Sequence, residues 1–303
     1  MHKLKELIIE LSQNCNLDCI MCGFGKSNNA SDKFMSFDNF KLTYEKLGKY
    51  SEKIRLNGRG ESTIHPQFKD VLKYIGESNQ ITLFTNGNYR DKEINDLFTL
   101  YSVQLFFSMD SPDKDNLEKI RRGVSFEILD NNIEELRKLD PRPYIVFTLQ
   151  EININDIISI AKYAISKNCN LIYNVVRRDS GIEVFQALVK EKYSVIVNSF
   201  NTVKTLYSLT GLECLIPDQI SGINIYSNIQ TTCGTRNICP NINGELCILY
   251  NGDVTPCNMF NPYIYGNLFI DSIENILNSD KRKWFVQNYK DYYYCKNCAC
   301  LVR

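Results

Sequence analysis

The stretch ELIIELSQNCNLDCIMC, residues 6–22, guides the interpretation of the whole chain. It opens with an apolar, β-branched run from Glu6 to Leu11, which predicts a buried strand. Three cysteines follow with the spacing C-x3-C-x2-C, at Cys15, Cys19 and Cys22. A strand that leads directly into such a cysteine loop predicts a metal site at the end of that strand.

Similar strand-like runs recur along the chain and alternate with segments of helical periodicity. The further runs are Lys53 to Asn57, Ile81 to Thr85, Val103 to Met109, Tyr144 to Gln150 and Leu171 to Val176. Between them lie apolar stripes at i, i+3, i+4 and i+7, which predict crossover helices; examples are Phe68, Val71, Leu72, Ile75 and Ile157, Ile160, Ala161, Ala164. The alternation predicts an α/β fold with a parallel sheet. Six units fall short of a closed barrel, so we expect a partial (β/α)6 TIM-like barrel with its chemistry at the carboxyl ends of the strands.

Composition excludes several classes of protein. A chain of 303 residues, 44% of them hydrophobic, can form one barrel-sized domain and a small appendage. Its 35 basic and 35 acidic residues cancel, so we expect no nucleic-acid partner and no anionic membrane surface. No apolar run approaches the roughly 18 to 20 residues of a membrane span, and residues 1–11 lack the features of a signal peptide. We therefore expect a cytoplasmic protein.

The chain holds twelve cysteines, and in a reducing compartment these indicate metal or redox chemistry. They form a front group and a back group, with only Cys169 and Cys214 between. Three thiolates leave one iron of a [4Fe–4S] cluster without a protein ligand, whereas an electron-transfer cluster normally takes four. S-adenosylmethionine (SAM) can chelate that iron through its amine and carboxylate. The alternatives are a zinc knuckle or inert buried thiols, but zinc needs a fourth ligand and the only histidines are His2 and His65.

With these features the sequence resembles the radical SAM superfamily. The resemblance implies that the three front cysteines are catalytic, as ligands of a SAM-binding [4Fe–4S] cluster. It also implies that SAM is cleaved reductively to a 5′-deoxyadenosyl radical, which abstracts a hydrogen atom from the substrate. The segment Asn57 to Glu61 is similar to the family's glycine–glutamate motif, which implies that Gly58, Gly60 and Glu61 meet the methionyl amine of SAM. Ser62 replaces the proline that usually follows.

The resemblance implies further cofactor-binding residues at the ends of the third and fourth strands. Thr85 and Asn86 are placed as the family places groups that line the SAM site. Ser108 and Asp110 are placed to hydrogen-bond the ribose hydroxyls. Met21 lies where the family prefers an aromatic side chain beside the adenine, and a thioether can also pack there.

An arginine is expected to bind the SAM carboxylate. Arg121 matches the family position at which a guanidinium makes a bidentate pair with that group. The adjacent Arg122 is an equally available donor. For each of these polar residues, the alternative is a solvated position at the start of a helix.

A second set of cysteines surrounds a predicted hairpin. The hairpin runs from Glu245 to Leu249 and from Asp253 to Pro256, around an Asn251-Gly252 dipeptide suited to a type I′ turn. A final helix is expected near Asp271 to Phe285. The cysteines number four and can fully ligate another cluster; they are Cys239, Cys257, Cys295 and Cys298.

This arrangement resembles the twitch or SPASM appendage of radical SAM enzymes. Because the chain stops at Arg303, before the cysteines of a further cluster, one auxiliary [4Fe–4S] cluster is implied. Cys233, Cys247 or Cys300 can replace one of the four ligands, and Cys247 alternates along the hairpin as a small core residue does. A terminal zinc ribbon is the main alternative. We thus divide the chain into a radical SAM barrel (1–178), a helical and loop connection (179–232) and a cysteine-rich hairpin-plus-helix domain (233–303).

An auxiliary cluster can accept an electron from a substrate radical, so the resemblance implies an oxidation. The cysteine spacing is most similar to that of dehydrogenases that oxidise an aminocyclitol alcohol, and we expect a small polyol, sugar or aminocyclitol as the substrate. One alternative is maturation of a ribosomally made peptide by crosslinking, thioether formation or epimerisation. A strand starting near Met1 leaves no room for a leader-binding module, but a spare thiol such as Cys214 suits an epimerase. A noncatalytic iron–sulfur protein is the other alternative, and an enzyme would need flavodoxin or ferredoxin as its reductant.

Overall fold

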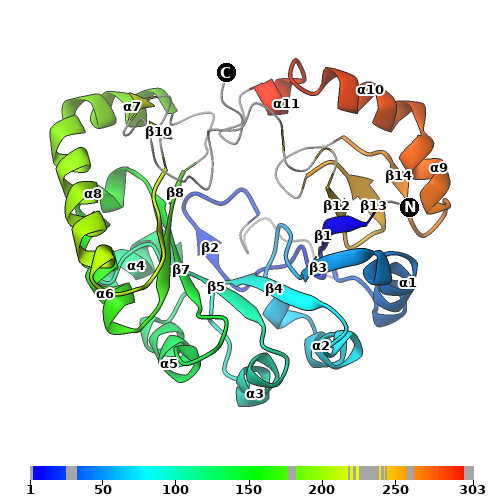
Figure 1. The fold of residues 1–303 in the computed structure, drawn as a ribbon, viewed down its shortest axis with the longest axis horizontal. Coiled ribbons are helices and arrows are strands. Elements are labelled where there is room, and N and C mark those ends of the chain that lie inside the picture. The colour runs from blue at the N-terminus through cyan, green and yellow to red at the C-terminus, as the bar shows by residue number, and fades with distance from the viewer. Residues whose placement is uncertain are drawn as a thin grey trace.

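The computed structural model describes residues 3–24, 33–176, 182–217, 219–220, 223–224, 239, 242, 244–257 and 263–296. Its main feature is a sheet with the strand order β14-β13-β12-β1-β3-β4-β5-β7-β8-β9 (Figure 1). These strands are β1 (Leu4–Ile9), β3 (Ser51–Arg55), β4 (Gln80–Thr85), β5 (Gln104–Ser108), β7 (Tyr144–Leu149), β8 (Asn170–Val175), β9 (Cys214–Leu215), β12 (Glu245–Ile248), β13 (Asp253–Thr255) and β14 (Gly266–Asn267). Two small pairs lie apart from this sheet: β2 (Asp18–Cys19) with β6 (Arg121–Arg122), and β10 (Gln219–Ile220) with β11 (Ile223–Asn224).

The six strands predicted from the sequence are confirmed as the parallel centre of the sheet. The short β9 adds another parallel strand beside β8. The α-helices are α1 (Phe37–Leu47), α2 (Phe68–Ile75), α3 (Lys92–Leu100), α4 (Lys114–Ile120), α5 (Phe126–Leu136), α6 (Ile157–Ser166), α7 (Ile182–Glu191), α8 (Tyr193–Ser208), α9 (Ile273–Asn278), α10 (Asp280–Asn288) and α11 (Tyr293–Lys296). Short 3-10 turns are η2 (Gly48–Tyr50), η3 (Ser62–Ile64) and η4 (Glu151–Asp156).

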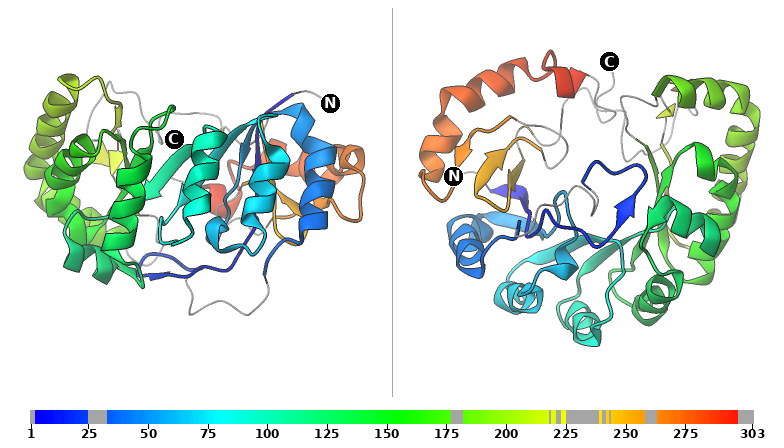
Figure 2. Two further views of the ribbon diagram at one scale, coloured as in Figure 1. Left: turned by 90° about the horizontal axis from the view of Figure 1, so that it is seen from below. Right: turned by 180° about the vertical axis from the view of Figure 1, so that it is seen from behind.

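The sheet is curved but does not close into a full barrel. The helices from α1 to α6 cover its convex side, and the loop that carries β2 lies on its concave side (Figure 1). Helices α9 and α10 lie at the end of the sheet that carries β14, whereas α7 and α8 lie at the opposite end, beyond β8 (Figure 2). The expected α/β fold with an incomplete, open-sided barrel is therefore confirmed.

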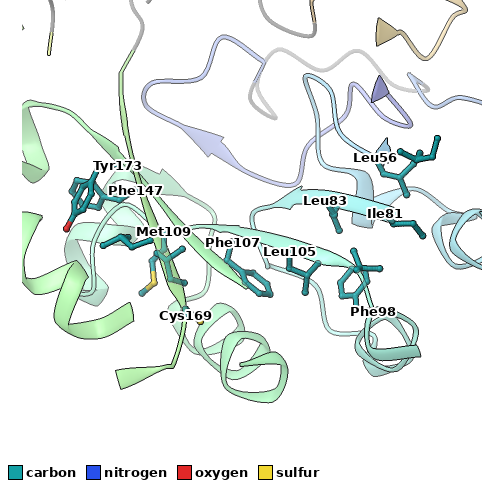
Figure 3. Packing of buried hydrophobic residues seen from close by; sticks show 14 of the residues in the cluster. Leu56, Ile81, Leu83, Phe98, Leu105, Phe107, Met109, Phe147, Cys169 and Tyr173 are labelled. Atoms are coloured by element: carbon teal, nitrogen blue, oxygen red, sulfur yellow. The ribbon is translucent and has the colours of Figure 1, made fainter. Parts of the chain in front are cut away.

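The hydrophobic core lies between the convex face of the sheet and the helices. Figure 3 shows Ile81 and Leu83 of β4 and Leu105 and Phe107 of β5 pointing to that side, and all four are buried. The apolar stripes predicted for α2 and α6 are buried at every position. Burying each large apolar side chain contributes about 1.5–3 kcal/mol, so this layer provides much of the stability of the barrel.

The concave face carries a row of flat side chains instead. The rings of Phe84 and Phe106 stack with centroids 4.3 Å apart, and Phe106 stacks on Tyr144 at 4.9 Å. The Arg55 guanidinium lies 5.5 Å from the centroid of Phe84 and forms an ion pair with Glu6. In an open barrel the inner layer has no opposite wall against which to interdigitate, so stacking along the sheet covers this face.

The cysteine-rich hairpin continues the barrel sheet. β12 pairs in parallel with β1, and Cys247 lies opposite Ile8. β13 and β14 then add antiparallel strands at that edge. The appendage is therefore joined to the barrel by main-chain hydrogen bonds, which the sequence did not predict.

Two local predictions for this region were wrong. A type I′ turn needs a positive φ at both central residues, but Gly252 has a φ of 87° while Asn251 has a negative φ. The carbonyl of Leu249 instead accepts the N–H of Gly252 at 2.9 Å, so the glycine follows the turn as a bulge residue. The single helix expected near Asp271 to Phe285 is two helices, because the Ser279 hydroxyl caps the start of α10.

No helix within the described ranges is both long and apolar enough to cross a bilayer. Of the predicted or competing cluster ligands, Cys233, Cys298 and Cys300 lie outside the described residues.

Candidate functional site

The three front cysteines lie on a loop at the carboxyl end of β1. The loop is held in place by a short antiparallel pairing in which Cys19 lies opposite Arg121 and Asp18 opposite Arg122. Within the loop, the N–H of Cys22 donates to the carbonyl of Cys19 at 3.0 Å. All three cysteines are partly buried. Pairing between β2 and β6 thus ties the cysteine loop to the segment that follows β5 and α4.

The surroundings of these thiols suit thiolates bound to a cation. The N–H of Leu17 donates to the Cys15 sulfur at 3.4 Å, and the N–H of Phe24 donates to the Cys22 sulfur at 3.4 Å. Burial raises the pKa of the Cys15 thiol to about 12, and the nearby Glu61 carboxylate adds to this effect. A thiol in such a setting becomes a thiolate when a metal supplies the compensating charge. The donor set and its N–H groups therefore fit three ligands of an iron–sulfur cluster.

Glu61 is buried and makes four hydrogen bonds inside the protein. Its Oε1 accepts from the N–H of Thr63 at 3.1 Å, from the Thr63 hydroxyl at 2.8 Å and from the Thr85 hydroxyl at 2.9 Å. Its Oε2 accepts from the N–H of Asn86 at 2.7 Å. Glu61 therefore fastens the segment after β3 to the end of β4.

Asn86 connects the end of β4 to the cysteine loop. Its side-chain amide donates to Asn16 Oδ1 at 2.8 Å and lies 3.9 Å from the Cys15 sulfur. The Asn16 amide in turn donates to the carbonyl of Asn88 at 2.9 Å. Asn16 was not predicted as a site residue from the sequence, although its place between two of the cysteines was a signal.

The two glycines of the segment after β3 are needed for contacts within the protein. A Cβ on Gly60 would lie 2.2 Å from the carbonyl oxygen of Asn14, and a Cβ on Gly58 would lie 2.3 Å from Cγ of Glu10. The N–H of Glu61 also donates to the Asn14 carbonyl at 2.8 Å. The sequence suggested that these glycines allow an approach to a ligand, but in the structure they allow the approach of the cysteine loop and of β1.

A buried ion pair lies below the cysteine loop. Asp110 is fully buried, and its Oδ2 lies 2.8 Å from Nε of Arg121, while its Oδ1 accepts from the N–H of Thr148 at 2.7 Å. Burial raises the pKa of Asp110, and the charge of Arg121 opposes that effect. The Arg121 side chain is also close enough to Cys19 to lower the pKa of that thiol against the effect of burial.

The structure distinguishes the two candidate arginines. The Arg121 side chain is 10% exposed, whereas the Arg122 side chain is 59% exposed. Arg122 Nε donates to the carbonyl of Asp18 at 2.9 Å, which directs its guanidinium to the outside of the loop. Only Arg121 therefore has its charge beside the cysteines. The alternative of a solvated position does not describe Asp110 or Arg121.

The remaining predicted positions lie around the same end of the sheet. Ser108 ends β5, and Met21 lies in the loop next to Cys22; both are partly buried. Five buried side-chain atoms near the ends of β1, β3 and β7 have no hydrogen-bond partner among the described residues: Glu10 Oε1, Asn14 Oδ1, Asn57 Oδ1, Arg59 Nε and Gln150 Nε2. Unpaired polar atoms are costly, so their concentration here fits a polar ligand such as SAM.

The second cysteine group lies around the hairpin and the last helices. Cys239 is partly buried, and its N–H donates to the Tyr289 hydroxyl at 3.4 Å. Cys239 and Cys295 are both close enough to Tyr265 to raise the pKa of its hydroxyl, in addition to burial. Cys257 follows β13, and its carbonyl accepts from the Thr255 hydroxyl at 3.0 Å.

Cys247 lies on the concave face of β12, opposite Thr255 of β13 and close enough to Cys257 for that thiol to affect its pKa. It is 1% exposed and packs with Ile8 and Leu249. Burial raises the pKa of its thiol. This agrees with the interpretation of Cys247 as a small core residue.

Comparisons with known proteins show the class to which this fold and site belong. A model of the radical SAM superfamily matches residues 9–164, just over half of the chain. A model of the SPASM iron–sulfur cluster-binding domain matches residues 239–299. The chain therefore belongs to the radical SAM superfamily and is an enzyme with a C-terminal SPASM domain, whose cofactors are SAM and [4Fe–4S] clusters.

Individual relatives are distant. The chain is 24% identical to the tungsten-containing aldehyde ferredoxin oxidoreductase cofactor-modifying protein of Pyrococcus furiosus, over 98% of this chain and 87% of that protein. Among solved structures it is similar to Streptococcus suis SuiB bound to its precursor peptide SuiA, with a TM-score of 0.70, 14% identity and coverage of 99% and 70% of the two chains. It is also similar to BtrN in complex with AdoMet and 2-DOIA, with a TM-score of 0.51, 14% identity and coverage of 99% and 93%. At these identities the two structures show a shared fold.

Proposed function

We propose that Cys15, Cys19 and Cys22 ligate a [4Fe–4S] cluster whose fourth iron binds SAM, and that this chain abstracts a hydrogen atom from its substrate. When bound, the cluster supplies the electron that cleaves SAM to methionine and a 5′-deoxyadenosyl radical. The observation that carries the proposal is the loop of three partly buried thiols, held by the β2–β6 pairing and supplied with N–H donors. The match to the superfamily supports it.

The chain's own groups are assigned to SAM as follows. Asp110 holds Arg121 through Nε, which leaves the terminal nitrogens of the guanidinium for the SAM carboxylate. We assign Asp110 to positioning, in place of the ribose contact suggested by the sequence, because both of its oxygens have partners in the protein. Ser108 remains the proposed ribose contact, and Met21 the proposed contact to the adenine.

Glu61 is likewise assigned to positioning, because its four hydrogen bonds are made inside the protein. It fastens the end of the glycine-rich segment to the end of β4. We propose that the main chain of Gly58 and Gly60 in this segment presents carbonyl groups to the methionyl amine. Thr85 and Asn86 complete this wall of the site. Asn86 also orients the cysteine loop through Asn16.

For the auxiliary cluster we propose Cys239, Cys257, Cys295 and Cys298 as ligands. The proximity of Cys239 and Cys295 to Tyr265 supports this set, and the burial of Cys247 on the concave face argues against its inclusion. We propose the division into residues 1–178, 179–232 and 233–303 on the same basis, with the third part joined to the barrel through β12. Flavodoxin or ferredoxin is the proposed source of electrons.

We propose that the reaction is an oxidation of a small polyol, sugar or aminocyclitol. A hydrogen atom leaves a carbon that bears a hydroxyl and passes to the deoxyadenosyl radical, which becomes 5′-deoxyadenosine. Oxidation of the resulting substrate radical to a ketone would release one proton and one electron, and an auxiliary cluster held by the second cysteine group would be the electron acceptor. The fold that this chain shares with BtrN, whose structure contains 2-DOIA, supports this substrate class.

A second candidate is modification of a peptide or protein. The higher TM-score to SuiB, crystallised with its precursor peptide, favours it, as does the relative described as cofactor-modifying. Deuterium transfer separates the two candidates. If the substrate is a polyol, deuterated polyols should transfer deuterium to 5′-deoxyadenosine and a deuterated peptide should not. If the substrate is a peptide, the reverse is expected.

The test of the basic proposal is anaerobic reconstitution followed by assay of 5′-deoxyadenosine with SAM and dithionite. Cys15→Ala should abolish the product, whereas Cys169→Ala, a matched change at a buried cysteine away from the site, should retain it. Iron should be about eight per chain and should fall to about four when the three front cysteines are replaced. Equal product from wild type and Cys15→Ala, or zinc in the second site, would contradict the proposal and favour a noncatalytic or zinc-binding protein.

A further inference from the structure

Glu10 is a buried carboxylate that lies between two functional parts of the enzyme. It directly follows β1 and is 0% exposed. On one side lies the segment after β3 that holds Gly58 and Arg59; on the other lies the hairpin of the SPASM domain. A charged residue at the end of an apolar strand was the sequence signal for it, but the sequence analysis did not use it.

The contact to the glycine-rich segment is close. Glu10 Oε2 accepts the main-chain N–H of Arg59 at 2.8 Å. A Cβ on Gly58 would lie 2.3 Å from Cγ and 2.4 Å from Oε2 of Glu10. Only glycine therefore fits at position 58 while the Glu10 side chain keeps this position. A main-chain N–H bound by a carboxylate is a strong, charge-assisted hydrogen bond. Glu10 therefore sets the position of the segment between Gly58 and Gly60.

The contact to the hairpin comes from the parallel pairing of β1 with β12. The N–H of Glu10 donates to the carbonyl of Ile248 at 2.9 Å, which places the carboxylate beside the turn that follows. Burial raises the pKa of Glu10, and the main-chain N–H groups of Arg59 and Tyr250 lower it. The carboxylate thus binds the glycine-rich segment through Oε2, while its Oε1 has no hydrogen-bond partner among the described residues. The link from Glu10 to the hairpin is its main-chain pairing with Ile248.

We propose that Glu10 is a positioning residue through which the hairpin of the SPASM domain supports the binding of SAM by the glycine-rich segment. This inference rests on the proposed assignment of that segment to SAM. Displacement of the hairpin turn shifts Glu10, and Glu10 shifts the main chain from Gly58 to Gly60. The SPASM domain thereby contributes to the first step of the reaction as well as to the fate of the substrate radical.

Glu10→Gln tests the proposal. The amide either accepts the Arg59 N–H through a neutral oxygen or turns its NH2 toward that N–H, so the charge-assisted hydrogen bond is lost in both cases. The KM for SAM should rise about tenfold, while kcat for 5′-deoxyadenosine at saturating SAM should change less than about twofold. Glu6→Gln is the matched control, because Glu6 also faces inward from β1 but pairs with Arg55, away from the segment.

A double-mutant cycle tests the connection to the hairpin. The Asn251 side chain supports the turn, since its amide donates to Asp253 Oδ2 at 2.8 Å and its Oδ1 accepts the N–H of Asp253 at 3.3 Å. Asn251→Ala should raise the KM for SAM in the wild type but should add little in Glu10→Gln, because the two changes act through one route.

Several outcomes would overturn the proposal. They are an unchanged KM in Glu10→Gln, an equal rise in Glu6→Gln, a loss of kcat with KM constant, and full additivity of Asn251→Ala with Glu10→Gln. Each of these outcomes can be measured only if the wild type cleaves SAM. If the wild type itself forms no 5′-deoxyadenosine, the proposed function fails first, so the two failures are distinguishable.

Discussion

The substitution Asp110→Asn removes the negative charge from the buried pair beside the cysteine loop and leaves the shape of the side chain nearly unchanged. Asp110 accepts from Thr148 at 2.7 Å through one oxygen and lies 2.8 Å from Arg121 Nε through the other. An asparagine must turn its NH2 toward one of these two N–H groups. Every rotamer therefore loses one contact and leaves the buried guanidinium without a counter-charge.

The expected cost follows from burial. Removing one partner of a buried ion pair costs about 3–5 kcal/mol, because the other charge stays out of water without compensation. Glu134 is the control: it is about half exposed and pairs with Arg137 (Oε1 to Nε, 2.6 Å) and with Lys167 (Oε2 to Nζ, 3.0 Å), and Glu134→Gln should cost about 0–1 kcal/mol. Because Arg121 also pairs with Cys19 through the main chain, the change should reach the SAM site and raise the KM for SAM about tenfold.

The assay combines anaerobic urea unfolding of the reconstituted protein with SAM-dependent formation of 5′-deoxyadenosine. The double variant of Asp110→Asn with Arg121→Met should be more stable than the sum of the single effects predicts, since it removes both charges. The reasoning is refuted if Asp110→Asn costs no more than Glu134→Gln, or if the two changes at the buried pair are simply additive.

Two further predictions concern the same end of the molecule. Burial lowers the pKa of His65 from 6.5, and Nδ1 accepts the Gln67 N–H at 3.1 Å, so the unfolded chain binds a proton more readily. The stability present above pH 6.5 should be lost as pH falls toward the folded pKa, and His65→Gln should flatten this part of the profile of thermal midpoint against pH. Gly60→Ala should reduce 5′-deoxyadenosine formation at least about tenfold, because its Cβ would lie 2.2 Å from the Asn14 carbonyl. Gly244→Ala, whose Cβ would lie 3.3 Å from the flexible Lys5 side chain, should be close to wild type.

The strands and helices of the barrel could be predicted because they follow local patterns. The run predicted from Glu6 to Leu11 is β1 at Leu4–Ile9, and the stripe from Phe68 to Ile75 is α2. Such patterns indicate which face of each element is buried, so they can be recognised without knowing which other elements pack against that face. The turn at Asn251 and Gly252 shows the limit, because the same dipeptide fits more than one hairpin geometry and the pairing of β12 with β13 selects among them.

The side-chain assignments at the site divide in a similar way. The motif residues do lie at one end of the sheet, because the carboxyl ends of parallel strands share an edge. The sequence could not choose between Arg121 and Arg122, since adjacent residues on a short strand point to opposite sides and only the β2–β6 pairing decides which side faces the cysteines. Nor could the sequence show that the carboxylate oxygens of Glu61 and Asp110 have their partners within the protein.

The sequence by itself determined the class of the enzyme: the C-x3-C-x2-C spacing after a strand, the alternation of strands and helices, and the four late cysteines are all local features. Only the tertiary structure decided that the SPASM hairpin extends the barrel sheet and that Glu10 connects it with the glycine-rich segment. The physical reason is that a hydrogen bond or a buried ion pair depends on which distant segments come within about 3 Å of each other. That proximity arises from the packing of the sheet and produces no periodic pattern in the sequence.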